Sequence, residues 1–305
     1  MKAKSPTRLV AVAGGKGGVG KTVCTANLAM GVAKRSRTLA VDLDLGCGNL
    51  NACLGVKLPS RNIEEFLRAD VASLSELRLT TPLDSLDLIS CSYQGTKWFS
   101  LEKDMKERLL RNLRDGNVDF TFIDLGAGIT GDILDFFSAA DMKILVTNPE
   151  SLALHNAYIF LKSLVYRTLA SEFEKDIFSA ATRNKLLELL NADEELDMTR
   201  VVARFRSWSR YSAYIVQGIL SDLKVHVILN MVTRAKDEKY AQNLRNLAYK
   251  YLHVDLAFLG AVPYDRHVKK SVNRLTPLLL EYQNAAASRA FEEISLRIEN
   301  ALALA

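Results

Sequence analysis

The sequence predicts an α/β fold, a doubly wound and mostly parallel β-sheet flanked by helices. Short runs rich in β-branched residues alternate with amphipathic stretches, which is the pattern of parallel strands joined by crossover helices. About seven such runs occur, which suits one sheet. A glycine-rich segment also separates the first run from the first amphipathic stretch, as in folds that bind anions where a strand turns into a helix.

The strands and helices are expected in alternating order. The predicted strands begin at Arg8, Thr38, Leu86, Asp119, Lys143, Lys224 and Leu256. The predicted helices cover residues 22–33, 101–113, 152–169, 240–252 and 285–302, where apolar residues recur at helical spacing. In the last of these, Phe291, Ile294 and Ile298 stand at core spacing beside several glutamates, so we expect a packing helix rather than a lipid-binding one.

Composition places the chain among ordinary globular proteins. It has 305 residues, of which 49% are hydrophobic and 25% charged, and its formal net charge is +5. This mild charge does not indicate a dedicated nucleic-acid binder, so specific nucleic-acid binding is not expected. No apolar run approaches the roughly 20 residues of a membrane span. We expect a cytoplasmic protein and leave open a peripheral association with the inner face of the membrane.

The cysteines give no sign of a disulfide framework or a metal site. Cys24, Cys47, Cys53 and Cys91 all lie in the first third of the chain, and no two of them form a C-x-x-C pair. We interpret them as small apolar residues in a reducing compartment.

The glycine-rich segment is the most specific motif in the chain. The segment GGKGGVGKT, residues 14–22, fits the phosphate loop G-x-x-x-x-G-K-[ST], whose backbone N–H groups surround an anion at a helix N-terminus. Lys21 should reach the β- and γ-phosphates, and Thr22 should ligate Mg²⁺. The loop residues expected to bind the nucleotide are Gly15, Gly17, Gly18, Val19, Gly20, Lys21 and Thr22.

A further lysine in this loop narrows the family. Lys16, in K-G-G-x-G-K-T, resembles the additional lysine of the deviant phosphate loop in the MinD/ParA family, which includes the flagellar regulator FlhG (FleN, YlxH), nitrogenase iron protein and ArsA. The resemblance implies that Lys16 reaches the nucleotide of a second subunit. A second cation there would stabilise the charge that spreads over the γ-phosphoryl oxygens.

Two aspartates follow the second predicted strand. In VDLDLGCGNLN, Asp42 and Asp44 stand two residues apart, so they share one face and lie beside the phosphate loop if the two strands are neighbours. The segment resembles the first switch of MinD and FlhG. By that resemblance Asp44 activates the attacking water and Asp42 supports Mg²⁺.

The fourth predicted strand ends in FIDLGAGI. Asp124 stands where a phosphate-loop enzyme keeps the aspartate that holds Mg²⁺ through water, and Gly126 and Gly128 follow it. FlhG-like proteins resemble this segment but typically have Thr where this chain has Leu125.

Three weaker matches complete the expected site. Glu150, in TNPES, resembles a position that contacts nucleotide across the dimer. Asn230 ends a predicted strand, where family members recognise adenine. Pro263, in VPYD, resembles the loop that closes over the base.

One segment exceeds the family pattern. We expect one phosphate-loop ATPase domain, residues 1–305, with a helical insertion at about 166–222. The insertion interleaves arginines with Trp208 and Tyr211. Such residues could contact a phosphate backbone, an acidic partner or anionic lipid, but we favour a solvated helical hairpin whose aromatics pack inward.

The resemblance implies a regulatory ATPase that uses ATP and Mg²⁺. It would form a homodimer when ATP is bound, hydrolyse ATP slowly with stimulation by a protein partner, and control the position or number of a cellular structure. Two alternatives stay open: a metabolic ligase or amidase of the cobyrinate or dethiobiotin synthase type, and a nucleotide-binding scaffold without turnover, which Leu125 allows. An iron–sulfur carrier is disfavoured, because no cysteine follows Asp124.

Overall fold

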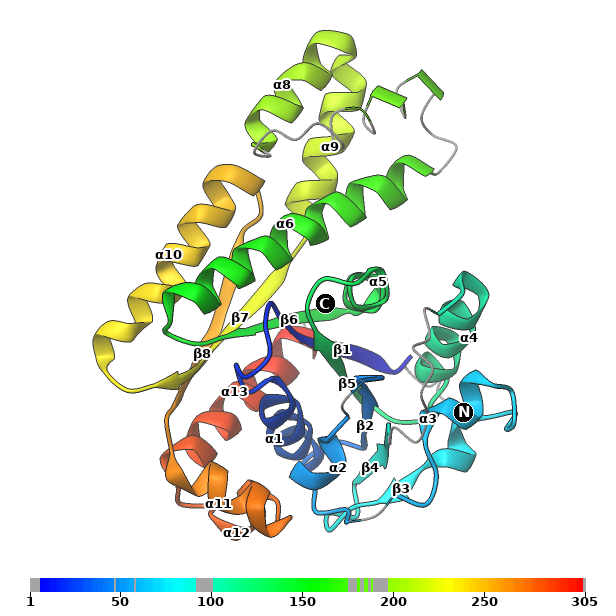
Figure 1. Ribbon diagram of the computed structural model, residues 1–305, viewed down its shortest axis with the longest axis vertical. Helices are drawn as coiled ribbons and strands as arrows, with labels where there is room; N and C mark the ends of the chain where they lie inside the picture. Colours follow the sequence, from blue (N-terminus) through cyan, green and yellow to red (C-terminus); the bar gives the residue numbers. More distant parts are fainter. Residues whose placement is uncertain are drawn as a thin grey trace.

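An eight-stranded sheet forms the centre of the molecule in the computed structural model (Figure 1). The structure describes residues 6–46, 48–57, 59–91, 101–174, 180–181, 184–185, 188 and 197–303. In spatial order the strands are β3 (Leu79–Thr80), β4 (Leu86–Ile89), β2 (Thr38–Leu43), β5 (Phe120–Ala127), β1 (Arg8–Gly14), β6 (Met142–Thr147), β7 (Val225–Val232) and β8 (Leu256–Pro263). Among the strand pairs of the described residues, only β3–β4 is antiparallel, which confirms the expected mostly parallel sheet.

The expected strands all form. The eighth, β3, is not visible in the sequence pattern, because two residues are too few to show the alternation of a strand. The strands that precede the phosphate loop and the aspartate pair are not neighbours: β2 pairs with β5 and β4, so β5 separates it from the phosphate-loop strand β1.

Helices connect the strands. They are α1 (Lys21–Ala33), α2 (Leu50–Cys53), α3 (Ile63–Leu67), α4 (Lys103–Arg114), α5 (Gly131–Ala139), α6 (Ser151–Glu174), α8 (Met198–Trp208), α9 (Arg210–Asp222), α10 (Lys239–Leu247), α11 (Arg266–Arg274), α12 (Leu278–Glu281) and α13 (Ala286–Ala303). All the expected helices form, although the turn Ala248–Leu252 at the end of α10 is π-helical. The sequence pattern missed α11 because most of its residues are charged or polar, it has only two apolar residues, Val268 and Val272, and it buries only Ser271.

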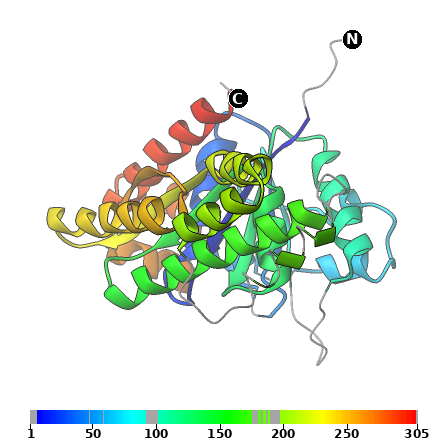
Figure 2. The same cartoon turned by 90° about the horizontal axis from the view of Figure 1, so that it is seen from above.

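Two hydrophobic cores pack on the two faces of the sheet. One contains residues of α1, α12 and α13, and the other contains residues of α4, α5, α6, α9 and α10. Figure 2 shows α13 (red) and α6 (green) on opposite sides of the molecule. The C-terminal helix is a packing helix as expected, since Phe291, Ile294 and Ile298 are buried.

The helices α8 and α9 lie at one end of the longest axis (Figure 1). The expected inward packing of their aromatics is wrong: Trp208 is 41% exposed and Tyr211 is 66% exposed. Both stand at the corner between the two helices, and the buried face is made by smaller residues together with Phe205. Residues 175–179, 182–183, 186–187 and 189–196 of the expected insertion lie outside the described residues.

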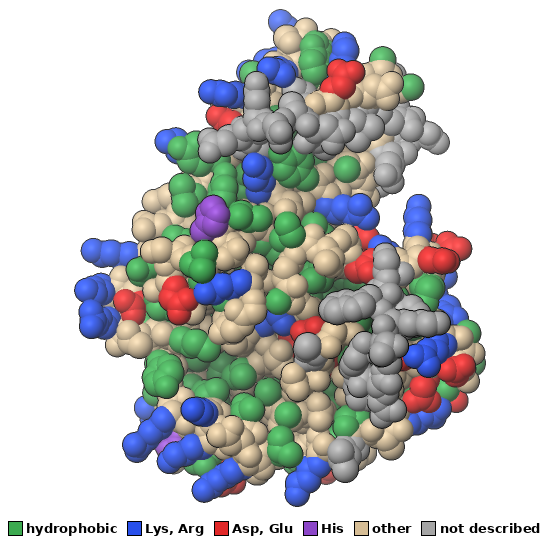
Figure 3. All heavy atoms as spheres, in the orientation of Figure 1, with side chains coloured by type: hydrophobic (Ala, Val, Ile, Leu, Met, Phe, Trp, Pro, Cys, Tyr) green, Lys and Arg blue, Asp and Glu red, His purple; other side chains and the backbone are tan. Residues whose placement is uncertain are grey.

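The charge of the visible surface and the hydropathy of the helices agree with what the composition predicts. In Figure 3, Lys and Arg side chains lie mostly around the rim of the visible face, with acidic side chains among them. This face therefore carries no single basic patch. Among the described helices, none is long and apolar enough to cross a membrane.

Candidate functional site

The phosphate loop lies at the carboxyl end of the central strand β1. Gly18 and Gly20 have φ of +84° and +85°, a left-handed conformation that glycine adopts at little cost. Gly20 is the N-cap of α1 and supplies no side-chain cap. The backbone N–H groups at the start of α1 are therefore available to an anion, as a phosphate site requires.

Lys21 sits between two carboxylates. Its Nζ lies 3.9 Å from Oδ2 of Asp44 and 4.0 Å from Oδ1 of Asp124, and its side chain is only 8% exposed. Asp44 thus reaches the loop even though β2 is not adjacent to β1. A phosphate that binds Lys21 must compete with these carboxylates, and a divalent cation would offset the resulting repulsion.

Asp124 is fully buried on β5. Its Oδ1 accepts a hydrogen bond from the Thr25 hydroxyl at 2.8 Å, and Thr22 also hydrogen-bonds to this carboxylate. Its Oδ2 is buried without a hydrogen-bond partner among the described residues. Burial raises the pKa of Asp124, while Lys21 and the two threonines oppose that rise.

These residues fit Mg²⁺. A carboxylate oxygen that is buried and unsatisfied needs a cation or a water on it. The described His, Cys, Asp and Glu side chains form no group of three or more suited to a metal ion. Mg²⁺ commonly takes only one or two carboxylates and completes its shell with water and phosphate oxygens, so Thr22 and Asp124 would be enough protein for it.

Asp42 shapes the loop that carries Asp44. Its Oδ1 accepts the backbone N–H of Asp44 at 3.0 Å, and its Oδ2 accepts that of Leu50 at 3.1 Å. Burial, together with the neighbouring charge of Asp124, raises the pKa of Asp42 to about 8. Asp42 therefore supports the site through the backbone, and its direct contact with Mg²⁺ stays a prediction.

Lys16 and Glu150 form an ion pair within one chain. The Lys16 Nζ lies 2.9 Å from the Glu150 Oε2, with the two side chains 25% and 58% exposed. The hydrogen bond from Lys16 lowers the pKa of Glu150. The two residues for which the sequence suggested contacts across a dimer are thus brought together at the edge of the phosphate loop.

A cavity beside the loop is suited to a nucleotide base. It has a volume of about 280 Å³ and contains Gly20, Asn230 and Pro263 from the expected set. The Asn230 Nδ2 donates to the Val19 carbonyl oxygen at 2.9 Å, so this side chain also braces the phosphate loop. Sequence reasoning missed the further lining residues Tyr264, Val268, Val272 and Phe291.

The missed lining residues had weak signals. Tyr264 stands inside the VPYD segment, and Asp265, which caps α11, could have revealed that helix and with it Val268 and Val272. The sequence predicted Phe291 as a core residue, and it is buried. It also lines the cavity, which its spacing in the sequence does not indicate.

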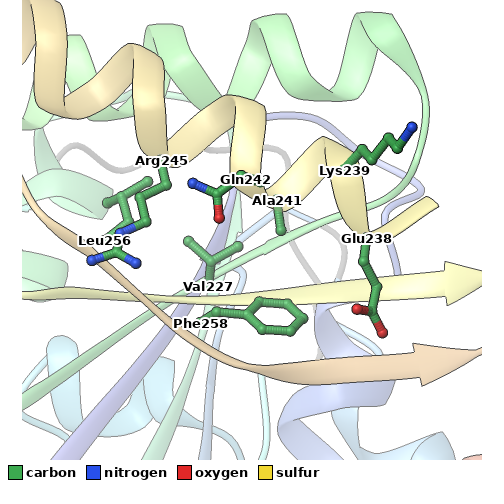
Figure 4. A pocket seen from close by; sticks show the side chains of 8 residues that line it. All are labelled: Val227, Glu238, Lys239, Ala241, Gln242, Arg245, Leu256 and Phe258. Atoms are coloured by element: carbon green, nitrogen blue, oxygen red, sulfur yellow. The ribbon is translucent and has the colours of Figure 1, made fainter. Parts of the chain in front are cut away.

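A second pocket lies away from this site. Figure 4 shows Val227 and Phe258 of the last two strands facing Ala241 and Gln242 of α10. None of the expected site residues lines this pocket. It therefore plays no part in the arrangement around the phosphate loop.

Fold and site together define a phosphate-loop nucleotide-binding protein, with the loop on the central strand and two carboxylates facing its lysine. The chain belongs to the CobQ/CobB/MinD/ParA nucleotide-binding domain family, whose model matches residues 10–278.

Individual relatives agree with this family. The chain is 24% identical over 303 residues to the antiactivator FleN of Pseudomonas aeruginosa, covering 98% of this chain and 89% of FleN. It is 25% identical over 299 residues to the chloroplastic septum site-determining protein MinD homolog of Arabidopsis thaliana, covering 95% and 74% of the two chains.

Solved structures share the fold. MinD of Pyrococcus horikoshii, complexed with Mg-ADP, has a TM-score of 0.62 at 19% identity and covers 98% of both chains. A chain of the MinC:MinD cell division protein complex of Aquifex aeolicus has a TM-score of 0.64 at 19% identity, and the match covers 96% of both chains.

Proposed function

We propose that this chain is an ATP-binding, slowly hydrolysing switch that dimerises with ATP and regulates the position or number of a cellular structure. The observation that carries the proposal is the phosphate loop with two lysines, in which Lys21 faces Asp44 and Asp124 while Lys16 stands at the exposed edge. The names of the relatives, an antiactivator and a septum site-determining protein, support a regulatory role.

Each residue has a defined task in the proposed reaction. The loop backbone and Lys21 bind the phosphates, and Thr22 and Asp124 hold Mg²⁺, which would neutralise phosphate charge. Asp44, whose side chain is 23% exposed and lies 3.9 Å from the Lys21 Nζ, orients the attacking water. Asn230 and Pro263 contribute to the base pocket.

In the proposed dimer, Lys16 is the residue that acts on the second subunit. Its side chain is 25% exposed and pairs with Glu150 on the same chain, a pair that ATP-dependent association can exchange for contacts across the interface. A protein partner is supported by the MinC:MinD complex among the structural relatives. We place the protein in the cytoplasm, and binding to an anionic membrane surface remains open.

ATP binding and hydrolysis by purified protein test this function. Lys21→Ala should weaken ATP binding by roughly 100-fold, because charged hydrogen bonds to phosphate contribute about 1.5–3 kcal/mol each. Asp44→Ala should keep ATP bound while lowering turnover by roughly 100-fold or more. Lys224→Ala, at an exposed lysine ahead of β7, is the matched control.

The same assays separate the alternatives. Unchanged ATP affinity in Lys21→Ala would remove the proposed site. ATP binding with no turnover in the wild type would favour a nucleotide-binding scaffold, and ADP release only with a small-molecule substrate would favour a metabolic ligase or amidase.

A further inference from the structure

Thr25 lies on α1, one turn beyond the phosphate loop, and is fully buried. Its hydroxyl oxygen is 2.8 Å from Oδ1 of Asp124 and 3.1 Å from the carbonyl oxygen of Lys21. The hydroxyl has one proton to donate. The carboxylate is the nearer and the charged acceptor, so the proton goes to Asp124.

Three donor groups lie against Asp124. Thr25 and Thr22 hydrogen-bond to its carboxylate, and the ammonium of Lys21 forms an ion pair with it at 4.0 Å. Thr25 and Lys21 both lie against Oδ1, and Oδ2 has no hydrogen-bond partner among the described residues. These donors therefore set the orientation of the Asp124 carboxylate, and with it the direction in which Oδ2 points.

Two of the three donors have other tasks once nucleotide binds. In the proposed function Lys21 moves to the phosphates and the Thr22 hydroxyl to Mg²⁺. Thr25 is buried one helical turn further on and has no role at the phosphates. It remains to hold Asp124 when the other two donors have left.

We infer that Thr25 is a positioning residue for magnesium: its hydroxyl fixes Asp124 so that Oδ2 points to the Mg²⁺ site of the nucleotide-bound protein. This inference rests on the proposed function. Groups that orient metal-binding carboxylates typically contribute 10–100-fold to metal affinity or activity. A buried hydroxyl is also costly unless it is hydrogen-bonded, and in α1 its acceptor is this carboxylate.

The dissociation constant of a non-hydrolysable ATP analogue, measured with Mg²⁺ and again with EDTA, tests the inference. In Thr25→Val, which keeps the side-chain shape, the affinity gained from Mg²⁺ should fall about 10-fold or more while the affinity in EDTA stays unchanged. Thr25→Ser should restore the gain, because it restores the donor.

Thr121→Val is the matched control. Thr121 is on the same strand as Asp124 and is fully buried, but its hydroxyl has no hydrogen-bond partner among the described residues. The same substitution there should leave the gain from Mg²⁺ intact.

Several outcomes overturn the inference. Thr25→Val could keep the full gain from Mg²⁺, or it could lose affinity equally in Mg²⁺ and EDTA, as a merely structural residue would. If Thr25→Val does not fold, Thr25→Cys can replace it, because the thiol is a weak donor and should give an intermediate loss of the affinity gained from Mg²⁺. An unchanged gain in Thr25→Cys together with a loss in Thr25→Ser would also refute the positioning role of Thr25. Failure of the wild type to bind the analogue would instead sink the proposed function.

Discussion

Asp42 and Asp124 are register partners on the neighbouring strands β2 and β5, so the site has two carboxyl groups side by side. Both carboxyls are buried, and burial raises the pKa of each; that of Asp42 reaches about 8, helped by the charge of Asp124. Two like charges this close, away from water, oppose each other unless a proton or a cation stands between them. The pair therefore favours a bound proton, which a cation at the site would replace.

A pH dependence of stability follows for the nucleotide-free protein. The folded pKa of Asp42 lies above its ordinary value of 3.8, so its contribution to the free energy of unfolding is fully present below about pH 4. That contribution is lost as the pH rises toward about 8. Denaturant midpoints in EDTA should therefore fall between pH 5 and pH 8 by more in the wild type than in Asp42→Asn.

Asp84→Asn, at an exposed aspartate, controls for loss of a carboxylate elsewhere. It should keep the wild-type pH dependence. Parallel curves for the wild type and Asp42→Asn would show that Asp42 is not a buried, proton-binding carboxyl.

The sequence predicts the residues of this site unevenly, for physical reasons. Lys21 and Thr22 are fixed by a local motif, because one loop and one helix N-terminus bind the phosphates. Thr25 is not predictable, since its role comes from a hydrogen bond to a residue 99 positions away. The support that Asp42 gives through backbone N–H groups is likewise visible only in the folded chain.

At the element scale, α6 packs directly on the phosphate loop. A Cβ at Gly15 would lie 2.3 Å from the Asn156 backbone carbonyl oxygen in α6, closer than real contacts allow. The loop and the helix thus meet through a glycine, and movement of one must affect the other. The long helix also extends from the loop toward α8 and α9 (Figure 1).

Gly15→Ala should therefore destabilise the protein. Because the added methyl group meets backbone atoms rather than a flexible side chain, we expect a loss of about 1–3 kcal/mol in the free energy of unfolding. Gly17→Ala, where nothing lies within 4 Å of the added Cβ, should change it by less than about 0.5 kcal/mol. Urea denaturation without nucleotide measures both, and equal midpoints for the two variants would contradict the packing.

Apolar periodicity predicted many of the elements but not all of them, since α5 buries an apolar face and was not among the predicted helices. The central strands and α13 show their buried faces in the sequence. The basic helix α11 does not, and the corner between α8 and α9 exposes Trp208 and Tyr211 against expectation, because a corner offers no helix face to cover them. The order of strands also escapes local patterns, as the place of β5 between β1 and β2 shows.

At the scale of the whole molecule, the pairing of Lys16 with Glu150 links the proposed switch to its oligomeric state. In one chain the two side chains neutralise each other at the exposed edge of the loop. An exposed pair of this kind contributes only about 0–1 kcal/mol, so it does not prevent Lys16 from moving to a better anion. The phosphates of a nucleotide on a second subunit would be such an anion.

If the proposed switch is right, ATP with Mg²⁺ should convert the monomer into a two-fold dimer, whereas ADP should leave it mostly monomeric, because Lys16 would contact the γ-phosphate across the interface. Lys16→Gln should lose ATP-induced dimerisation and turnover but keep most of its ATP affinity, since Lys21, Thr22 and the loop backbone still bind the phosphates.

Lys57→Gln, at an exposed lysine outside the loop, should behave as the wild type. Light scattering with ADP, ATP and a non-hydrolysable analogue, beside turnover measured against protein concentration, tests the mechanism. If the mass in ATP stays monomeric and the specific activity does not depend on concentration, Lys16 has no partner to act on, and the metabolic ligase becomes the better hypothesis.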